Sequence, residues 1–282
     1  MNRAAFDYFS DLLRRESGLQ MTPEKYYLLE TRLHPIVQQQ GLTGIEALAS
    51  LLRRDEGNNV VRQAVVEAMA THETSFFRDL SPFDYLRDTV LPLMSEKRAG
   101  AKSLRVWSAA CASGQEAYSI AMLLREYGAP FQAWKIDITA TDISHDILRR
   151  AQSGIYSQFE VQRGLPARLL IKYFTQQGEQ WHLRDEMRQM VNFRQANLLT
   201  PPPVPAGSMD IVFCRNVLMY LDMSSRVRVM QGLHHAMHAD SVLFLGAAET
   251  AGGLGEMFRP VAGRAGVFVR GDSTLGLPVS PA

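Results

Sequence analysis

The sequence predicts an α/β protein. An all-helical N-terminal domain precedes a doubly wound, largely parallel sheet domain with a small inserted antiparallel β subdomain. Three observations point to this fold class. Over about the first 70 residues, apolar positions recur only at helical spacing. From about residue 100, short apolar runs rich in β-branched residues alternate with helical stretches. Residues 155–190 interrupt that alternation with a short helix and a hairpin pattern.

The helical N-terminal domain is predicted over residues 1–75. Four apolar stripes mark its helices, and they begin with Phe6, Tyr26, Ile45 and Val60. Before the second stripe, Thr22-Pro23 has the pattern of an N-cap followed by a proline in the first helical position. Since no strand pattern occurs here, we expect a small helical bundle.

The sheet domain is predicted over residues 76–270. Its strands are expected at six apolar runs: 104–108, 136–141, 191–195, 211–214, 242–246 and 267–270. Continuous apolar runs are typical of parallel strands covered on both faces. Prolines and glycines before the last run favour a hairpin, so the sheet is expected to end in an antiparallel pair. In the insert, 166–174 is expected to be helical and 178–190 to form a hairpin. The tail, 271–282, is expected to be disordered.

Composition narrows the function classes. The chain has 282 residues, 46% of them hydrophobic, and a formal net charge of +1. Near-neutral charge argues against a global electrostatic grip on nucleic acid. No run approaches the roughly 18 apolar residues of a membrane span, and the first residues lack signal-peptide character, so a cytoplasmic protein without membrane insertion is expected. The two cysteines, Cys111 and Cys214, are interpreted as buried free thiols of a reducing compartment.

The segment LRVWSAACASGQEAYSIAMLL predicts a strand, a turn of small residues and a helix. Such a turn lets a ligand approach the backbone, and the free amides of the helix would face it. The turn holds only Gly114, so the G-x-G-x-x-G fingerprint of nicotinamide dinucleotide sites is absent. A tight βα turn with no ligand is the alternative.

Polar residues follow three other predicted strands. Asp142 could hold a ribose diol or could be the N-cap of the next helix. Asn197 could bond an adenine edge or could be a turn residue before Pro201. Arg215 and Asn216 are pocket candidates because they follow an apolar strand abruptly.

Five motifs in order, THETSFFRD at 71–79, WSAACASGQEAYSIA, ATDIS, ANLL and CRNVLMYLD, resemble the CheR family over nearly the whole chain. These are chemotaxis-receptor protein-glutamate O-methyltransferases that use S-adenosylmethionine. The resemblance implies a Rossmann-like class I methyltransferase domain behind the helical domain. It also implies methyl ester formation on glutamates of the cytoplasmic helical domain of chemoreceptors, with S-adenosylhomocysteine as product.

The resemblance also implies the site residues. The cofactor contacts it assigns are His72, Thr74, Arg78, Glu116, Asp142, Asn197, Leu198, Arg215 and Asn216. It assigns Arg78 and Tyr220 to orienting the acceptor carboxylate and the methyl group. His72 stands where the family usually has asparagine. Without the resemblance, Arg78 would be interpreted as a solvated arginine paired with Asp79 or Glu73.

The chemistry fits these residues. An acceptor glutamate, with a pKa of about 4.3, is already ionised at neutral pH and needs no general base. No metal is expected, because His234, His235 and His238 lack a carboxylate or cysteine cluster and are interpreted as a solvated helix face.

The partner is expected to be the chemoreceptor alone, bound by a monomer. The helical domain has about as many acidic as basic residues, so a positive docking face requires segregated charges. Tyr173-Phe174 precedes a loop with the single Gly178, which resembles the members that do not depend on a receptor C-terminal tether peptide. A catalytically weak cofactor-binding regulator of a chemosensory pathway is the alternative.

Overall fold

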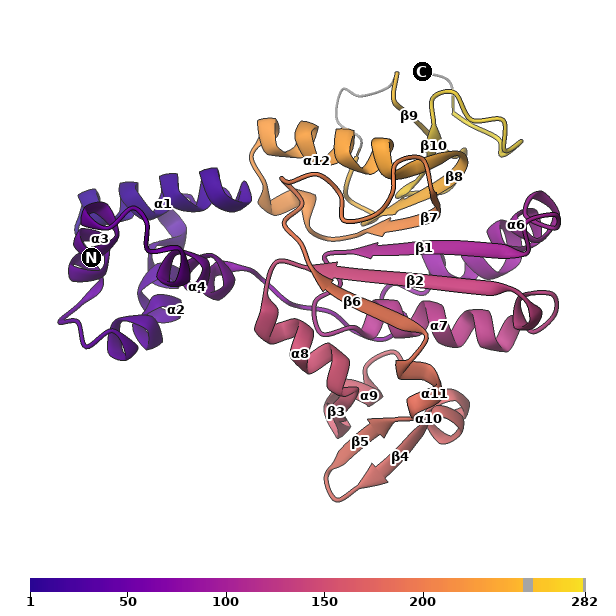
Figure 1. The fold of residues 1–282 in the computed structure, drawn as a ribbon, viewed down its shortest axis with the longest axis horizontal. Coiled ribbons are helices and arrows are strands. Elements are labelled where there is room, and N and C mark those ends of the chain that lie inside the picture. The colour runs from indigo at the N-terminus through magenta and orange to yellow at the C-terminus, as the bar shows by residue number, and fades with distance from the viewer. Residues whose placement is uncertain (251–255, 281–282) are drawn as a thin grey trace. The chain divides into compact units, whose positions relative to one another are not determined.

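A computed structural model describes residues 1–250 and 256–280 (Figure 1). The chain forms two compact units. One contains residues 1–71 together with 219–228, and the other contains 72–218 and the chain from residue 229 onward. The first unit therefore ends at Thr71, whereas the sequence predicted residue 75, and it includes a segment from far along the chain.

The helical unit is built from α1 (Arg3–Ser17), η1 (Pro23–Lys25), α2 (Tyr26–Gln39), α3 (Ile45–Arg54) and α4 (Asn59–Met69). Each of the four α-helices buries its apolar stripe, so that Phe9, Leu12, Leu33 and Leu48 are fully buried. Asn2 and Asn58 cap α1 and α4 by accepting backbone N–H bonds. The predicted helical bundle is present, with the second helix beginning at Tyr26 after the 3₁₀ turn that holds Pro23.

The sheet unit opens with α5 (Ser81–Tyr85), the π-helical turn η2 (Leu86–Val90) and α6 (Leu91–Lys97). Its main sheet has the order β6-β2-β1-β7-β8-β10-β9. These strands are β1 (Ser103–Ala109), β2 (Lys135–Asp142), β6 (Val191–Gln195), β7 (Met209–Cys214), β8 (Met237–Leu245), β9 (Phe258–Pro260) and β10 (Val267–Arg270). Strands β6, β2, β1, β7 and β8 pair in parallel, while β10 pairs antiparallel with both β8 and β9. All six predicted strands and the antiparallel end are confirmed.

The connecting helices of the sheet are α7 (Gln115–Tyr127), η3 (Phe131–Ala133), α8 (His145–Ser153), η4 (Leu218–Tyr220) and α12 (Met223–Ala236). Helix α7 contacts β2 and β6, and α8 packs on the same two strands (Figure 1). Because the parallel strands end at one edge, their loops and the first turn of α7 meet there, which is where open α/β sheets bind ligands.

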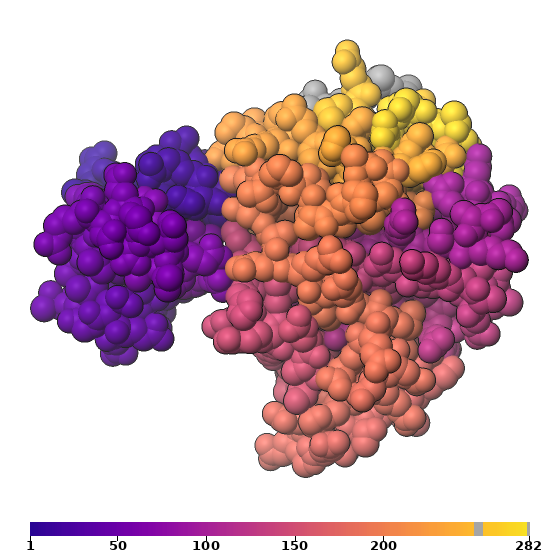
Figure 2. All heavy atoms as spheres, in the orientation of Figure 1, coloured from indigo at the N-terminus to yellow at the C-terminus, as the bar shows by residue number. Residues whose placement is uncertain are grey.

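The insert forms a second sheet of order β3-β5-β4 and is visible as a separate lobe in salmon colours in Figure 2. Its elements are β3 (Ile155–Ser157), α9 (Gln158–Gln162), α10 (Ala167–Tyr173), β4 (Phe174–Gln177), β5 (Gln180–Leu183) and α11 (Asp185–Arg188). The predicted hairpin is displaced, because Gly178 lies in its turn rather than at its start. Phe76 packs edge-on against Tyr156 and Phe174 and so anchors the insert.

The predicted disorder of the tail is wrong for residues 271–280. Leu275 is buried, the Ala262 amide donates to the Pro278 carbonyl, and Val279 forms a β-bridge with Val261. The apolar residues of this polar-looking segment cover the β9–β10 end of the sheet. Residues 281 and 282 lie outside the described residues.

The insert also depends on a close backbone approach at Gly164. Its φ is +89°, and a Cβ there would lie 2.1 Å from the Phe76 carbonyl oxygen. Gly178 has a φ of +61° with no atom within 4 Å of such a Cβ. We expect Gly164→Ala to lower the free energy of unfolding by about 3 kcal/mol or more, from left-handed strain plus backbone displacement. Gly178→Ala should cost only the strain, about 1–2 kcal/mol. If urea denaturation showed the same loss of unfolding free energy for both variants, the close approach at Gly164 would be contradicted.

Candidate functional site

The loop between β1 and α7 is short and contains only residues with small side chains. Ala110 and Ala112 have φ values of 60° and 48°, and Gly114 has a φ of 90° as the residue before α7. The Tyr156 hydroxyl, from the insert, donates to the Ser113 carbonyl over 2.9 Å. The loop is thus fixed from outside, and the first turn of α7 is available to a ligand at the strand edge.

Asp142, at the end of β2, lies beside this loop. Its side chain accepts the Ala112 amide at 2.9 Å and the Ser144 amide at 3.1 Å. The N-cap of α8 is Ser144, whose hydroxyl accepts from Ile147, so the capping alternative for Asp142 is wrong. A carboxylate offers about four acceptor positions, so Asp142 retains capacity for two hydroxyl groups of a ligand.

His72 faces the same carboxylate. Its Nε2 lies 3.5 Å from Asp142 Oδ1, which is ion-pair distance, but the geometry makes no hydrogen bond and Nε2 is buried without a hydrogen-bond partner in the described residues. We regard the pair as a contact and not as a bond, since hydrogen bonds weaken steeply when misaligned. An unbonded ring nitrogen beside a carboxylate is an arrangement that a polyhydroxyl ligand would complete.

Arg215 is the centre of a buried ionic network. It follows β7, its side chain is 1% exposed, and it donates to Glu116 Oε2 at 3.2 Å and to Asp79 Oδ2 at 2.7 Å. It also donates to the Arg78 carbonyl at 3.0 Å, while Ser108 donates to the other Glu116 oxygen at 2.8 Å. Burial raises the pKa of the Glu116 carboxyl, with the charge of Arg215 acting in the opposite direction.

The segment that carries Arg78 is strained. Phe77, Asp79 and Leu80 have φ values of 47°, 69° and 46°, in the region that side chains other than glycine rarely adopt. Non-glycine residues there cost about 1–2 kcal/mol each. The bonds from Arg215 to the backbone of Arg78 and to the side chain of Asp79 hold this turn in place.

Among the described residues, no carboxylate forms an ion pair with the Arg78 guanidinium, whereas a solvated arginine would be expected to pair with Asp79 or Glu73. Arg78 Nη1 donates to the Glu73 carbonyl at 2.8 Å, whereas the Glu73 carboxylate pairs with Arg163. The charge of Arg78 nevertheless acts on Glu116, where it opposes part of the rise in pKa that burial causes. Arg78 therefore keeps most of its five donors for a further acceptor.

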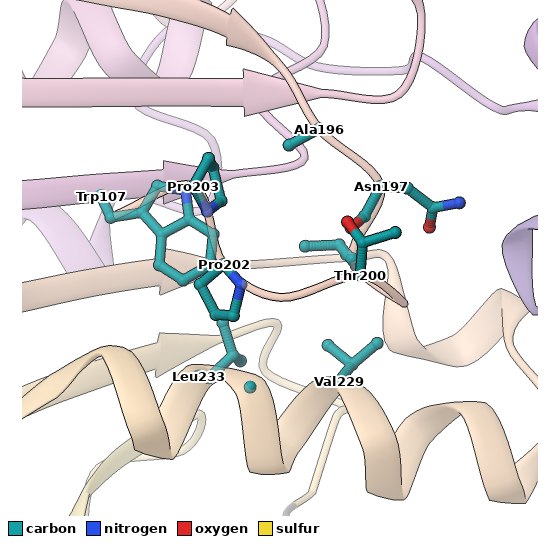
Figure 3. Close-up of a pocket in the computed structure, with 10 residues that line it drawn as sticks. Trp107, Ala196, Asn197, Thr200, Pro202, Pro203, Val229 and Leu233 are labelled. Carbon is teal, nitrogen blue, oxygen red and sulfur yellow. The ribbon is translucent and has the colours of Figure 1, made fainter. Parts of the chain in front are cut away.

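A small pocket lies beyond the end of β6. Figure 3 shows Trp107, Pro202, Pro203 and Leu233 gathered on one side, with Asn197 and Thr200 on the other. Asn197 Oδ1 accepts the Leu199 amide, so Asn197 stabilises a turn, as one of the two interpretations predicted. The same residue also lines the pocket. Leu198 also lines this pocket, whose wall is mostly apolar.

The remaining predicted residues are dispersed. Asn216 has a φ of 59°, and its amide donates to the buried Glu249. Thr74 is half-buried in the segment before Phe76. Tyr220 belongs to the helical unit, while every other predicted site residue belongs to the sheet unit. The structure thus joins His72 to Asp142 and Arg78 to Glu116 through Arg215.

Sequence reasoning missed three contributors. Asp79 binds Arg215, Ser108 binds Glu116, and Trp107 lines the pocket while its Nε1 donates to Thr141. Only Asp79 had a local signal, since a charged residue directly follows Arg78. The other two are neighbours in the fully buried half of β1 and look like ordinary strand positions.

Neither a metal centre nor a reactive thiol emerges in residues 1–250 and 256–280. No group of three metal-binding side chains occurs there. His238 lies on β8, where its Nδ1 contacts Arg98. The prediction that His234, His235 and His238 share one helix face is therefore wrong. Burial raises the pKa of Cys111 and Cys214 well above that of a free thiol, and both are free and buried as predicted.

The fold and site together define a methyltransferase of the Rossmann-like kind. Residues 72–267 match the family model described as "CheR methyltransferase, SAM binding domain", and residues 4–70 match "CheR methyltransferase, all-alpha domain". The chain belongs to the CheR family, and its cofactor is S-adenosylmethionine. Within the described residues, no helix is both long enough and apolar enough to cross a membrane.

Curated chemotaxis methyltransferases are similar to this chain over most of its length. Chemotaxis protein methyltransferase 1 of Pseudomonas aeruginosa is 35% identical over 272 residues, covering 95% of this chain and 97% of the relative. Chemotaxis protein methyltransferase Cher2 of Pseudomonas putida is 36% identical over 262 residues, covering 91% and 94%. The chemotaxis protein methyltransferase of Borreliella burgdorferi is 32% identical over 240 residues, covering 84% of each chain.

The Arg215 network makes a stability prediction. Arg215→Met keeps side-chain volume but leaves the buried Glu116 carboxylate without its cation. We expect a loss of about 3–5 kcal/mol in urea-induced unfolding, the usual cost of an uncompensated buried charge. Arg149→Met, which breaks the exposed pair with Asp146, is the control and should change stability by about 0.5 kcal/mol or less. Similar small changes in both variants would show that the network does not stabilise the fold.

Proposed function

We propose that this protein transfers the methyl group of S-adenosylmethionine to glutamate side chains of the cytoplasmic helical domain of chemoreceptors, forming methyl esters for adaptation in chemosensory signalling. The observation that carries the proposal is the Arg78 segment. A guanidinium with most of its donors uncommitted is held in a strained turn beside the buried Glu116 carboxylate. That arrangement suits an anionic acceptor brought to a cationic donor.

The residues of the sheet unit suit the cofactor. Asp142 and the unbonded nitrogen of His72 offer bonds to the ribose hydroxyls. Asn197 and Leu198, in the wall of the Trp107 pocket, offer a slot for the adenine. When bound, S-adenosylmethionine supplies a methyl group activated by a sulfonium.

Charge favours the methionine end of the cofactor in the same place. Glu116 and Asp79 both bind the single guanidinium of Arg215, and the charge of Arg78 also acts on Glu116. We assign Glu116 and Arg215, with Thr74 and Asn216, to that end. A buried carboxylate with incomplete compensation favours a neighbouring cation.

The acceptor needs orientation more than activation. An ionised glutamate attacks without a general base, so the protein must hold oxygen, methyl carbon and sulfur in line. We assign Arg78 to a two-pronged hydrogen bond with the acceptor carboxylate and Tyr220 to a directional bond from its hydroxyl.

The proposed substrate determines where in the cell the reaction takes place. Acceptor glutamates on a cytoplasmic receptor domain require a cytoplasmic enzyme, which we propose works as a monomer. We also propose that it does not depend on a receptor tether peptide. The support is the short β4–β5 turn, in which only Gly178 and Glu179 separate the two strands.

Arg78 gives the first test of the proposed reaction. We expect Arg78→Ala to lower turnover about 100-fold, because the acceptor loses its orienting bonds. Transfer of labelled methyl from S-adenosylmethionine to a receptor cytoplasmic fragment measures it. The exposed Arg149→Ala is the control and should keep wild-type turnover. Near-normal turnover of Arg78→Ala would remove this arginine from the mechanism, while cofactor binding without turnover in the wild-type chain would favour a regulator.

Glu116 gives a pH test. Because burial raises the pKa of the Glu116 carboxyl, its protonation begins at a higher pH than for an ordinary glutamate. Cofactor affinity should therefore fall as pH is lowered through that raised pKa, since the neutral acid no longer favours a cation. Calorimetric titration across pH should show this fall in the wild type. Glu116→Gln should bind weakly at all pH values without it.

The matched control lies on the same helix. Glu126 has its pKa lowered by Lys172 and Tyr173, so Glu126→Gln should keep the wild-type profile. A Glu116→Gln variant that retains the wild-type pH profile would show that another group titrates.

A further inference from the structure

The segment that carries Tyr220 is part of the helical unit. Residues 219–228 cluster with residues 1–71, although the chain on either side of them belongs to the sheet unit. The connection is an antiparallel β-bridge between Leu19 and Leu221. The Gln20 amide donates to the Tyr220 carbonyl at 2.8 Å, and the Asp222 amide donates to the Gly18 carbonyl at 3.0 Å.

The turn that makes this bridge follows from the end of α1. Gly18 is the C-cap, with a φ of 74°, and its amide donates to the Arg14 carbonyl. Glycine adopts this left-handed conformation at little cost, which turns the chain out of the helix and presents the next two residues in extended form. Leu221, opposite Leu19, is 5% exposed, so the bridge is packed as well as hydrogen-bonded.

The other side of Tyr220 is fixed by its own segment. Asp222 Oδ1 accepts the Ser225 amide at 2.9 Å and so caps the first turn of α12. Arg226 Nε donates to the Leu221 carbonyl at 2.9 Å. These bonds order the backbone after Tyr220, while the carbonyl of Tyr220 itself is held by Gln20. Since the Cα and the carbonyl of a residue set where its side chain begins, the bridge fixes the root of the tyrosine.

We propose that the turn Gly18–Gln20 is a positioning element for Tyr220, so that the backbone at the end of α1 influences turnover. This inference rests on the proposed function, in which the Tyr220 hydroxyl orients the reacting groups. It adds that the position of this hydroxyl is set by a backbone bridge to the end of α1. A small displacement of an orienting group is enough to lower a rate substantially.

The test removes one donor from the full-length chain. Gln20→Pro deletes the amide that bonds Tyr220 and keeps Leu19 extended, as residues before proline prefer. Gln20→Ala keeps the amide and is the conservative variant. Each is combined with Tyr220→Phe in a double-mutant cycle, with methyl transfer to a receptor cytoplasmic fragment at saturating substrate as the readout.

We expect Gln20→Pro to lower kcat about tenfold, and Gln20→Ala to retain the wild-type value. In the Tyr220→Phe background, Gln20→Pro should lower kcat no further, because it acts only through the hydroxyl that Tyr220→Phe has already removed. The calorimetric Kd for S-adenosylhomocysteine should stay within about twofold, and the melting temperature should fall by about 2–4 °C, the shift typical of one lost hydrogen bond. A purely structural role would instead change Kd, or would reduce kcat equally in both backgrounds.

The outcomes separate the two claims. If Tyr220→Phe lowers kcat while Gln20→Pro does not, the positioning role is overturned and the proposed function stands. If Tyr220→Phe has normal kcat, the assigned role of the tyrosine fails, and the inference fails with it. Should Gln20→Pro not fold, Gly18→Val strains the same turn through its positive φ and is expected to reproduce the loss of kcat. Normal kcat in a folded Gly18→Val variant would equally overturn the positioning role.

Discussion

The guanidinium of Arg215 is the interaction on which the site depends. It joins the end of β7, the first turn of α7 and the turn at residues 77–80, which are far apart in sequence. The turn contains three non-glycine residues with positive φ, and such strain persists only where surrounding contacts over-determine it. Arg215 supplies two of those contacts, and the Phe77 amide supplies another by donating to the Ser119 hydroxyl. Without Arg215, the turn would lose its bonds to the end of β7, and the buried Glu116 would lose its hydrogen-bonded cation.

The same interaction explains the charge of the site. One arginine is hydrogen-bonded to two carboxylates, and the charge of Arg78 acts on one of them. Low exposure makes these charge interactions stronger than they would be in water. Arg78 lies beside this network with its donors uncommitted, so an anionic acceptor is favoured next to a cationic donor. The proposed reaction removes both charges, and we expect a partly dehydrated cleft to favour it.

Much of the fold could be predicted from the sequence, because apolar periodicity is a local signal. The six strand runs, from 104–108 to 267–270, carry it in their β-branched residues, and all six are strands. The tail could not be predicted this way, since Leu275 is buried by contacts with the sheet and not by any local pattern. The register of the insert hairpin failed for a related reason, as Gly178 marks a turn without stating which residues flank it.

The site was predictable only in part. Polar residues at strand ends indicated Asp142 and Arg215, and motif resemblance supplied roles for the rest. The Asp79–Arg215 pair and the Leu19–Leu221 bridge join segments that are distant in sequence, and no spacing rule reveals such pairs.

The central claim is that a glutamate side chain is methylated at this site. The most direct measurement is mass spectrometry of a receptor cytoplasmic fragment after incubation with the protein and isotope-labelled S-adenosylmethionine. We expect labelled methyl groups on glutamate side chains, released by mild base as expected of an ester, and formed about 100-fold more slowly with Arg78→Ala. Label on another residue type, or an unlabelled receptor despite cofactor binding, would contradict it.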